Sequence, residues 1–178
     1  HTRVVMDLLS GKKIYYWDAR TFGYVKYVED IKNAQGIQKS KLGPDPWEIT
    51  EESFYKLVNK YQRPIKNLIL DQALLAGVGN IYANDGLWEA GIDPRRAASS
   101  LSKAESKKLL LALRKVMERG LITGGASDNS YVNALGQKGS YQDEFRVYKR
   151  TGKPCLKCGT KLERIVVGSR GSWICSEC

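Results

Sequence analysis

Four cysteines stand near the end of the chain in two pairs with metal-ligand spacing. Cys155 and Cys158 form the first pair, Cys175 and Cys178 form the second, and 16 residues separate the pairs. Four thiolates at this spacing are the ligands of a tetrahedral structural zinc site, which leaves no coordination position open. Two redox disulfides are the alternative, although they would need a βαβ context that the sequence does not show. The spacing therefore predicts one structural Zn²⁺ ion.

The segment between the two pairs predicts a β-hairpin. Leu162–Val167 and Trp173-Ile174 are strand-like, and the turn Gly168–Gly171 between them presents Arg170 at its tip. An arginine on a rigid turn beside a basic surface suits contacts to phosphates or insertion toward a DNA groove. An exposed arginine without a ligand is the alternative reading of this segment.

A second group with binding potential is the glycine turn Gly77-Val78-Gly79-Asn80, which opens a helical pattern. A helix start offers unpaired backbone N–H groups and the positive end of the helix dipole, both of which suit a phosphate. A glycine-bearing connection between two packed helices explains the same residues equally well.

The charge of the chain favours a polyanionic partner. The 178 residues carry 29 Lys and Arg against 19 Asp and Glu, and the segment 145–178 holds eight cations and two acids. This balance favours nucleic acid over a merely solvated basic surface. Four cysteines are too few for a disulfide-stapled secreted scaffold, and no apolar run approaches the roughly 18 residues of a membrane span.

The elements that must position these groups follow from local patterns. Three short strands are expected before a loop at 30–46, and helices are expected from Thr50 to Arg63, over Ile69–Leu75, from the glycine turn to Gly91, and after Ser102. Ser102 and Glu105 form a capping-box pattern. The expected strands are 3–9, 13–17 and 24–28.

Three strands alone leave an apolar face and an open edge, so we expect them to be the remnant of a larger sheet. The chain opens on His1 with no leader-like segment before the first strand. We therefore expect a fragment of a longer protein.

Together these segments resemble the formamidopyrimidine-DNA glycosylase and endonuclease VIII family, and the first of the two types more closely. The resemblance covers nearly the whole chain, and its motifs are Asp71-Gln72, AGVGNIYANDGLWEAGIDP, GGASDNSY, FRVYKRTGKPCLKCG and SRGSWICSEC. It implies an α+β fold. The implied parts are the end of an N-terminal β-sandwich (1–30), a linker (31–49), a helix-two-turn-helix domain (50–144) and a β-hairpin zinc finger (145–178).

The resemblance also implies roles for single residues. Asn80 and Lys66 would grip the phosphates that flank a lesion, and Arg170 would be the arginine of the zinc hairpin. Arg20 would face the base left unpaired, and Phe22 would wedge into the base stack. An ordinary position in the sheet core is the alternative for Phe22.

A long loop at 124–142 corresponds to the family's lesion-capping loop, with Ser127, Asn129 and Tyr131 as implied contacts. Thr21 stands where relatives often carry a basic residue, which puts one phosphate contact in doubt.

Family members attack the sugar with the secondary amine of an N-terminal proline, and no Pro-Glu start exists in this sequence. The implied parent is a bifunctional DNA glycosylase and abasic-site lyase of base excision repair, which removes oxidised purines such as oxoguanine and formamidopyrimidines. We expect this chain to hold no catalytic residue, to recognise and bind damaged DNA, and to be inactive alone.

The implied partner is double-stranded DNA with oxidised bases or abasic sites. The implied protein is a monomer in the bacterial cytoplasm, associated with the nucleoid. Association of two copies through the truncated sheet is the alternative to a monomer. Three other functions stay open: an endonuclease VIII type acting on oxidised pyrimidines, a non-catalytic nucleic-acid-binding zinc module, and a structural assembly subunit.

Overall fold

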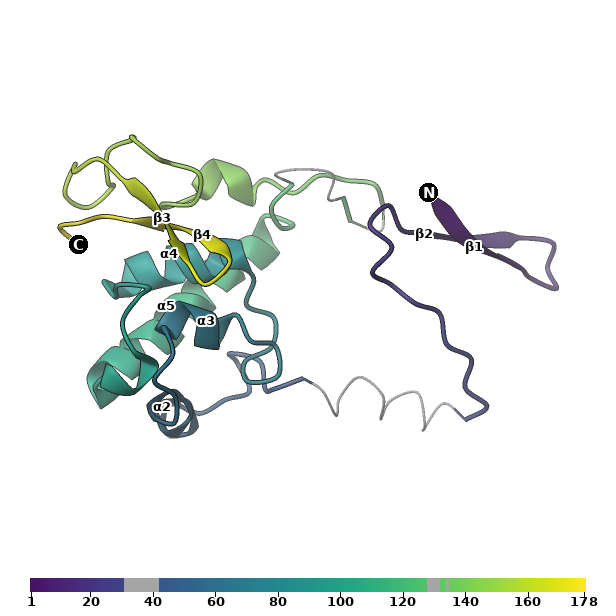
Figure 1. The fold of residues 1–178 in the computed structure, drawn as a ribbon. Helices are drawn as coiled ribbons and strands as arrows, with labels where there is room; N and C mark the ends of the chain where they lie inside the picture. The colour runs from purple at the N-terminus through teal and green to yellow at the C-terminus, as the bar shows by residue number, and fades with distance from the viewer. Residues whose placement is uncertain (31–41, 128–131, 134) are drawn as a thin grey trace. The chain divides into compact units, whose positions relative to one another are not determined.

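The computed structural model describes residues 1–30, 42–127, 132–133 and 135–178 (Figure 1). The chain forms two compact units, His1–Gln38 and Lys39–Cys178, whose boundary falls within the undescribed segment 31–41. Each unit is described by itself.

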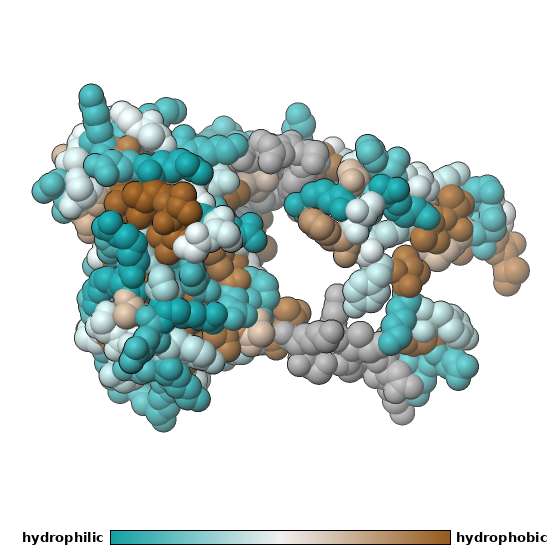
Figure 2. Space-filling model, in the orientation of Figure 1, coloured by the Kyte–Doolittle hydropathy of each residue, from teal (hydrophilic) through white to brown (hydrophobic). Residues whose placement is uncertain are grey.

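The first unit is built on one antiparallel hairpin of β1 (Thr2–Asp7) and β2 (Lys13–Trp17), in which Met6 lies opposite Ile14. The strand expected over 24–28 is wrong, because these residues have no regular secondary structure. Strand-like composition needs a neighbour that accepts its backbone hydrogen bonds, and the described part of this sheet consists of β1 and β2 alone. Hydrophobic side chains therefore stand at the surface of this unit (Figure 2).

The second unit contains the helices and the C-terminal hairpin, which confirms the α+β class. Its helices are α2 (Glu51–Asn59), α3 (Ile65–Ile69), α4 (Asn80–Ala90) and α5 (Lys103–Ile122), with short 3₁₀ turns η1 (Ala98–Ser100) and η2 (Tyr141–Glu144). The hairpin pairs β3 (Glu163–Val167) with β4 (Arg170–Ile174).

Local capping signals set the starts of two helices as expected. The Thr50 side chain accepts the N–H of Ser53 at the start of α2. Ser102 and Glu105 form the complete capping box of α5, with each side chain bonded to the other residue's backbone N–H.

The helix expected over Ile69–Leu75 is wrong in its placement. The helical segment there, α3, begins at Ile65 and ends at Ile69. Asp71 then turns the chain, since its carboxylate accepts the N–H of Ala73 and its carbonyl accepts the N–H groups of Leu74 and Leu75. The apolar residues that looked helical are thus part of a compact turn that leads to the start of α4.

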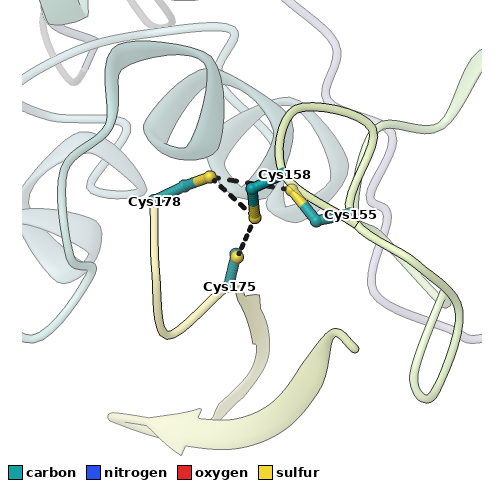
Figure 3. Close-up of side chains that lie close together, drawn as sticks. All are labelled: Cys155, Cys158, Cys175 and Cys178. Carbon is teal, nitrogen blue, oxygen red and sulfur yellow. Dashed lines mark hydrogen bonds between the residues drawn. The ribbon is translucent and has the colours of Figure 1, made fainter. Parts of the chain in front are cut away.

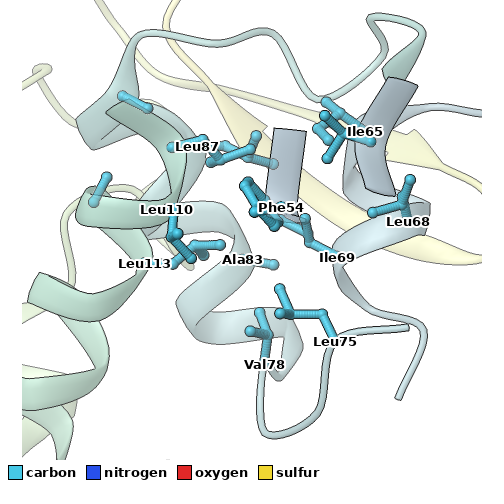
Figure 4. Close-up of a cluster of buried hydrophobic side chains, with 14 of the residues drawn as sticks. Phe54, Ile65, Leu68, Ile69, Leu75, Val78, Ala83, Leu87, Leu110 and Leu113 are labelled. Atoms are coloured by element: carbon cyan, nitrogen blue, oxygen red, sulfur yellow. The ribbon is translucent and has the colours of Figure 1, made fainter. Parts of the chain in front are cut away.

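The main core lies between α2, α3, α4 and α5, whose side chains point into one cluster (Figure 4). Phe54 of α2, Leu68 of α3 and Leu110 of α5 are fully buried there. A second, smaller cluster joins α4 to the zinc-finger segment through Trp88, Val147, Cys155, Leu162, Trp173 and Cys175. Because the two clusters share α4, this helix connects the helical core to the hairpin.

Among the residues that the structure describes, none of the helices combines the length and the apolar character that a membrane span needs.

Candidate nucleic-acid interface

Three side chains from α3 and α4 converge on one backbone carbonyl of β4, that of Gly171. Lys66 Nζ donates to this oxygen at 2.7 Å, Asn80 Nδ2 at 3.3 Å and Asn84 Nδ2 at 3.4 Å. Gly171 directly follows Arg170 in the chain. These bonds therefore fix the hairpin arginine relative to the start of α4, and we call Lys66, Asn80, Asn84 and Gly171 the hairpin anchor.

The amine of Lys66 is buried within this anchor, and the side chain is 0% exposed. It also donates to Ser172 Oγ at 2.6 Å. Burial, together with the nearby positive charge of Arg170, lowers the pKa of Lys66 to about 8. The amine is thus engaged by the hairpin, and the direct phosphate contact expected of Lys66 stays a prediction.

Asn80 is the first residue of α4, and Gly79 is the N-cap, with no side-chain hydrogen bond capping the helix. The positive end of the helix dipole is therefore not shielded by a capping oxygen. The Asn80 side chain is half-buried, which leaves part of it accessible beside this helix end. An accessible amide beside a helix N-terminus suits a phosphate oxygen.

Arg170 does not stand at the tip of a four-residue turn, so that expectation is wrong. Val167 pairs with Arg170, and the turn consists of Gly168 and Ser169 alone. Gly168 has a φ of 61° at the first turn position, as a type II′ hairpin requires. Arg170 is exposed at the first position of β4, one residue from the hairpin anchor.

In the first unit, Asp18 organises the loop that carries Arg20 and Phe22. Its carboxylate accepts the N–H groups of Arg20, Thr21 and Gly23 at 3.0, 2.9 and 2.8 Å. These bonds, the one to Gly23 foremost, hold the pKa of Asp18 below its usual value. A Cβ on Gly23 would lie 1.6 Å from the Tyr16 hydroxyl oxygen, so a larger residue there would have to displace the Tyr16 side chain.

This loop projects its two candidate residues outward. Phe22 is 83% exposed, so it is not a core residue of this unit, and the Arg20 guanidinium carbon lies 5.8 Å from the centre of its ring. An exposed aromatic ring beside a cation suits stacking on nucleobases.

The loop after α5 is tied together at its base. Ser127 donates its N–H to Gln142 Oε1 at 2.9 Å, and its hydroxyl oxygen accepts the N–H of Gly139 at 2.9 Å. Ser127 therefore holds the two ends of the loop together. Asn129 and Tyr131, the other implied lesion contacts, lie outside the described residues.

The four cysteines meet in one cluster, as their spacing predicts (Figure 3). All four lie among the described residues and none forms a disulfide. Their sulfur atoms lie within 4.8 Å of one another, with 3.7 Å between those of Cys155 and Cys178 and 3.4 Å between those of Cys158 and Cys175. A tetrahedron with metal–sulfur bonds of about 2.3 Å has edges of roughly 3.8 Å. The cluster therefore fits one structural zinc ion.

Asp85 is a positioning residue that the sequence reading missed. It is fully buried in α4, where its carboxylate accepts the Tyr141 hydroxyl at 3.1 Å and the N–H groups of Arg146, Val147 and Tyr148 at 3.0–3.3 Å. Burial raises its pKa, and the four donors oppose that shift. The sequence feature that could have indicated this role is an aspartate among the small and apolar residues of a helix. The Asp85 carboxylate ties the segment that leads into the zinc finger to α4.

Two family profiles match the chain. Residues 42–131 match the formamidopyrimidine-DNA glycosylase H2TH domain, and residues 152–178 match the zinc finger found in FPG and IleRS. These ranges cover all four residues of the hairpin anchor, Ser127 and all four cysteines.

Curated relatives carry the same resemblance over the whole chain. The formamidopyrimidine-DNA glycosylase of Ligilactobacillus salivarius is 39% identical over 100% of this chain and 65% of its own length. That of Streptococcus pyogenes serotype M18 is 39% identical over 100% of this chain and 66% of its own length. The chain thus spans just under two thirds of the length of these curated relatives.

Solved structures agree with the fold. The MutM (Fpg) protein of Thermus thermophilus is 38% identical and superposes with a TM-score of 0.83, covering 99% of this chain and 68% of its own. Lactococcus lactis Fpg in complex with DNA containing an abasic site is 32% identical, with a TM-score of 0.81 over 92% of this chain and 60% of its own.

Proposed function

This chain belongs to the formamidopyrimidine-DNA glycosylase family, and from that premise we propose that it is the DNA-binding and lesion-recognition portion of a base-excision-repair glycosylase. The observation that carries the proposal is the hairpin anchor, in which Lys66, Asn80 and Asn84 meet the carbonyl next to Arg170. A helix N-terminus and an arginine held at a fixed separation can bind two phosphates of one bent backbone.

Under this proposal each candidate residue has a defined task. Asn80 and Arg170 contact phosphates, while Lys66 either joins them or holds the hairpin in place. Arg20 and Phe22 fill the space left by an extruded nucleotide, and the loop with Ser127, Asn129 and Tyr131 covers the extruded base. The zinc ion, when bound, supplies a structural crosslink that keeps the hairpin folded, with no catalytic task.

The substrate class is proposed from the relatives. The Lactococcus lactis protein has been solved with DNA containing an abasic site and with DNA containing Fapy-dG. We accordingly assign to the parent protein the removal of oxidised purines, followed by cleavage at the abasic site. We also propose that the chain consists of the end of a β-sandwich, a linker, a helical domain and a zinc finger. The parent protein would be a monomer that acts on the bacterial nucleoid.

The first test measures equilibrium binding of the 178-residue chain to two duplexes by fluorescence anisotropy. One duplex contains an abasic-site analogue and the other is intact. We expect tighter binding to the first duplex. We also expect the affinity to fall steeply with salt, because lysine and arginine side chains that bind phosphates release counterions from the DNA. Equal binding to both duplexes would favour a general nucleic-acid-binding module instead.

The second test addresses the chemistry. Full-length protein, given duplexes with an oxidised purine or an oxidised pyrimidine, should excise the purine faster and be trapped on abasic DNA by borohydride. The 178 residues alone should bind abasic DNA without forming the covalent adduct. An adduct with these residues, or faster excision of the pyrimidine, would contradict the proposal.

A further inference from the structure

A hydrogen bond joins α4 to the sulfur of one zinc ligand, and the residue that donates it is not itself a ligand. Trp88, near the C-terminal end of α4, points its indole N–H at the sulfur of Cys155, with 3.3 Å between nitrogen and sulfur. Trp88 is 8% exposed. A buried indole N–H needs an acceptor, and the sulfur of a metal-bound cysteine carries the negative charge that makes it a good one.

Lys157 lies over the face of the same indole. This residue lies between the first two cysteines, and its Nζ atom sits 4.2 Å from the centre of a Trp88 ring. The amine also donates to the carbonyls of Trp88 and Glu89 at 2.8 and 3.0 Å. A cation at the last carbonyls of a helix stabilises that end, so the metal-binding turn grips the end of α4 in two ways.

The opposite end of α4 carries Asn80 and Asn84 of the hairpin anchor. One helix of 11 residues therefore contacts the zinc centre at its C-terminal end and the carbonyl beside Arg170 at its N-terminal end. A rigid helix held at both ends can transmit the state of one end to the other.

We propose that Trp88 is a positioning residue of the zinc centre: its N–H bond to Cys155 favours the metal-bound thiolate, and through it zinc occupancy fixes α4 beneath the DNA-binding hairpin. The first half of this proposal rests on the four-cysteine cluster and is independent of the DNA substrate. Removal of such an outer hydrogen bond weakens metal binding in other sites by about 10- to 100-fold.

The first experiment compares zinc affinity in two matched variants of the full chain. Trp88→Phe keeps an aromatic ring and removes the N–H. Trp173→Phe makes the same change in the same apolar cluster, but the Trp173 indole donates to Thr151 Oγ1 at 2.9 Å and not to sulfur. Competition with a chromophoric chelator measures each affinity. We expect a loss of about 10- to 100-fold in Trp88→Phe and little change in Trp173→Phe. Equal losses in both would overturn the proposal.

The second experiment uses the unmodified chain, so it does not depend on how a variant folds. An NMR-active cadmium isotope replaces zinc, and couplings from the metal to N–H···S protons are recorded. The backbone N–H of Lys157 donates to Cys155 Sγ at 3.4 Å and provides the internal reference. We expect a coupling to the Trp88 indole proton as well. A spectrum with the Lys157 coupling and without the Trp88 coupling would remove the basis of the proposal.

The link to DNA binding has its own readout. If Trp88 couples the two ends of α4, Trp88→Phe should bind DNA more weakly than the unmodified chain even at saturating zinc, and Trp173→Phe should not. Equal DNA affinity of Trp88→Phe and the unmodified chain at saturating zinc would show that the bond to Cys155 does not transmit the occupancy of the centre.

Discussion

The buried amine of Lys66 donates a hydrogen bond of 2.7 Å to the carbonyl of Gly171, 105 residues further along the chain. Gly171 sits between Arg170 and the buried Ser172, whose hydroxyl takes a second bond from the same amine. A lysine of α3 thus helps to set the position of the strand that carries the hairpin arginine, together with Asn80 and Asn84 of α4.

Replacement of Lys66 by methionine separates two roles for this residue. If Lys66 only positions the hairpin, Lys66→Met should weaken DNA binding about tenfold, equivalent to about 1.4 kcal/mol, with no change in the slope of log affinity against log salt. If Lys66 neutralises a phosphate, the magnitude of the slope should fall by about 0.9. Anisotropy titrations across a salt series measure both quantities, and the buried amine favours the first result.

Arg170 supplies the contrast, because its side chain is exposed on β4. In Arg170→Ala we expect both a lower affinity and a salt slope reduced by about 0.9, as one phosphate contact is lost. Arg95→Ala is a suitable control, since Arg95 already pairs with Asp93. Equal slopes in Arg170→Ala and the unmodified chain would remove Arg170 from the interface.

The lowered pKa of Lys66 makes stability depend on pH in the alkaline range. Its folded pKa is about 8, against an ordinary value of 10.5. Between these values the unfolded chain binds a proton that the folded chain has released, so this residue makes the free energy of unfolding rise with pH. Urea denaturation of the unmodified chain and of Lys66→Met should diverge across this window. Parallel pH profiles would contradict the lowered pKa.

Local signals in the sequence were sufficient for several elements. Ser102 and Glu105 predicted the start of α5, because a capping box involves residues three apart. The cysteine spacing predicted the metal cluster, because two Cys-x2-Cys pairs at this separation are typical of the four ligands of one structural zinc ion.

Long-range contacts decided the features that the sequence left open or misplaced. Residues 24–28 have strand-like composition but lack a pairing neighbour in the described part of the chain. Arg170 was placed in a turn, whereas pairing with Val167 extends β4 to include it. The partners of Lys66 and Asp85 lie far away in sequence, and no local pattern indicates which distant donors or acceptors will surround a residue.

Asp85→Asn tests whether the buried carboxylate of α4 holds the segment that leads to the zinc finger. The amide turns one acceptor into a donor that faces existing donors, such as the N–H of Val147. Leaving a buried donor unpaired costs about 1–3 kcal/mol, which we expect as the loss in unfolding free energy. Hydrogen exchange should also accelerate at the amides of Arg146–Tyr148. The exposed Asp143→Asn should change stability by no more than about 0.5 kcal/mol.

Removal of zinc should affect the two apolar clusters of the second unit differently. The core formed by α2–α5 contains no metal ligand and should keep its helical signal in circular dichroism. The smaller cluster contains Cys155 and Cys175, so it should loosen together with β3 and β4. Because the hairpin anchor depends on β4, DNA affinity should fall on chelation and return when zinc is added. A chain that stays helical and also keeps its lesion preference after chelation would show that α4 grips DNA without the hairpin, and the role proposed for Arg170 would then be wrong.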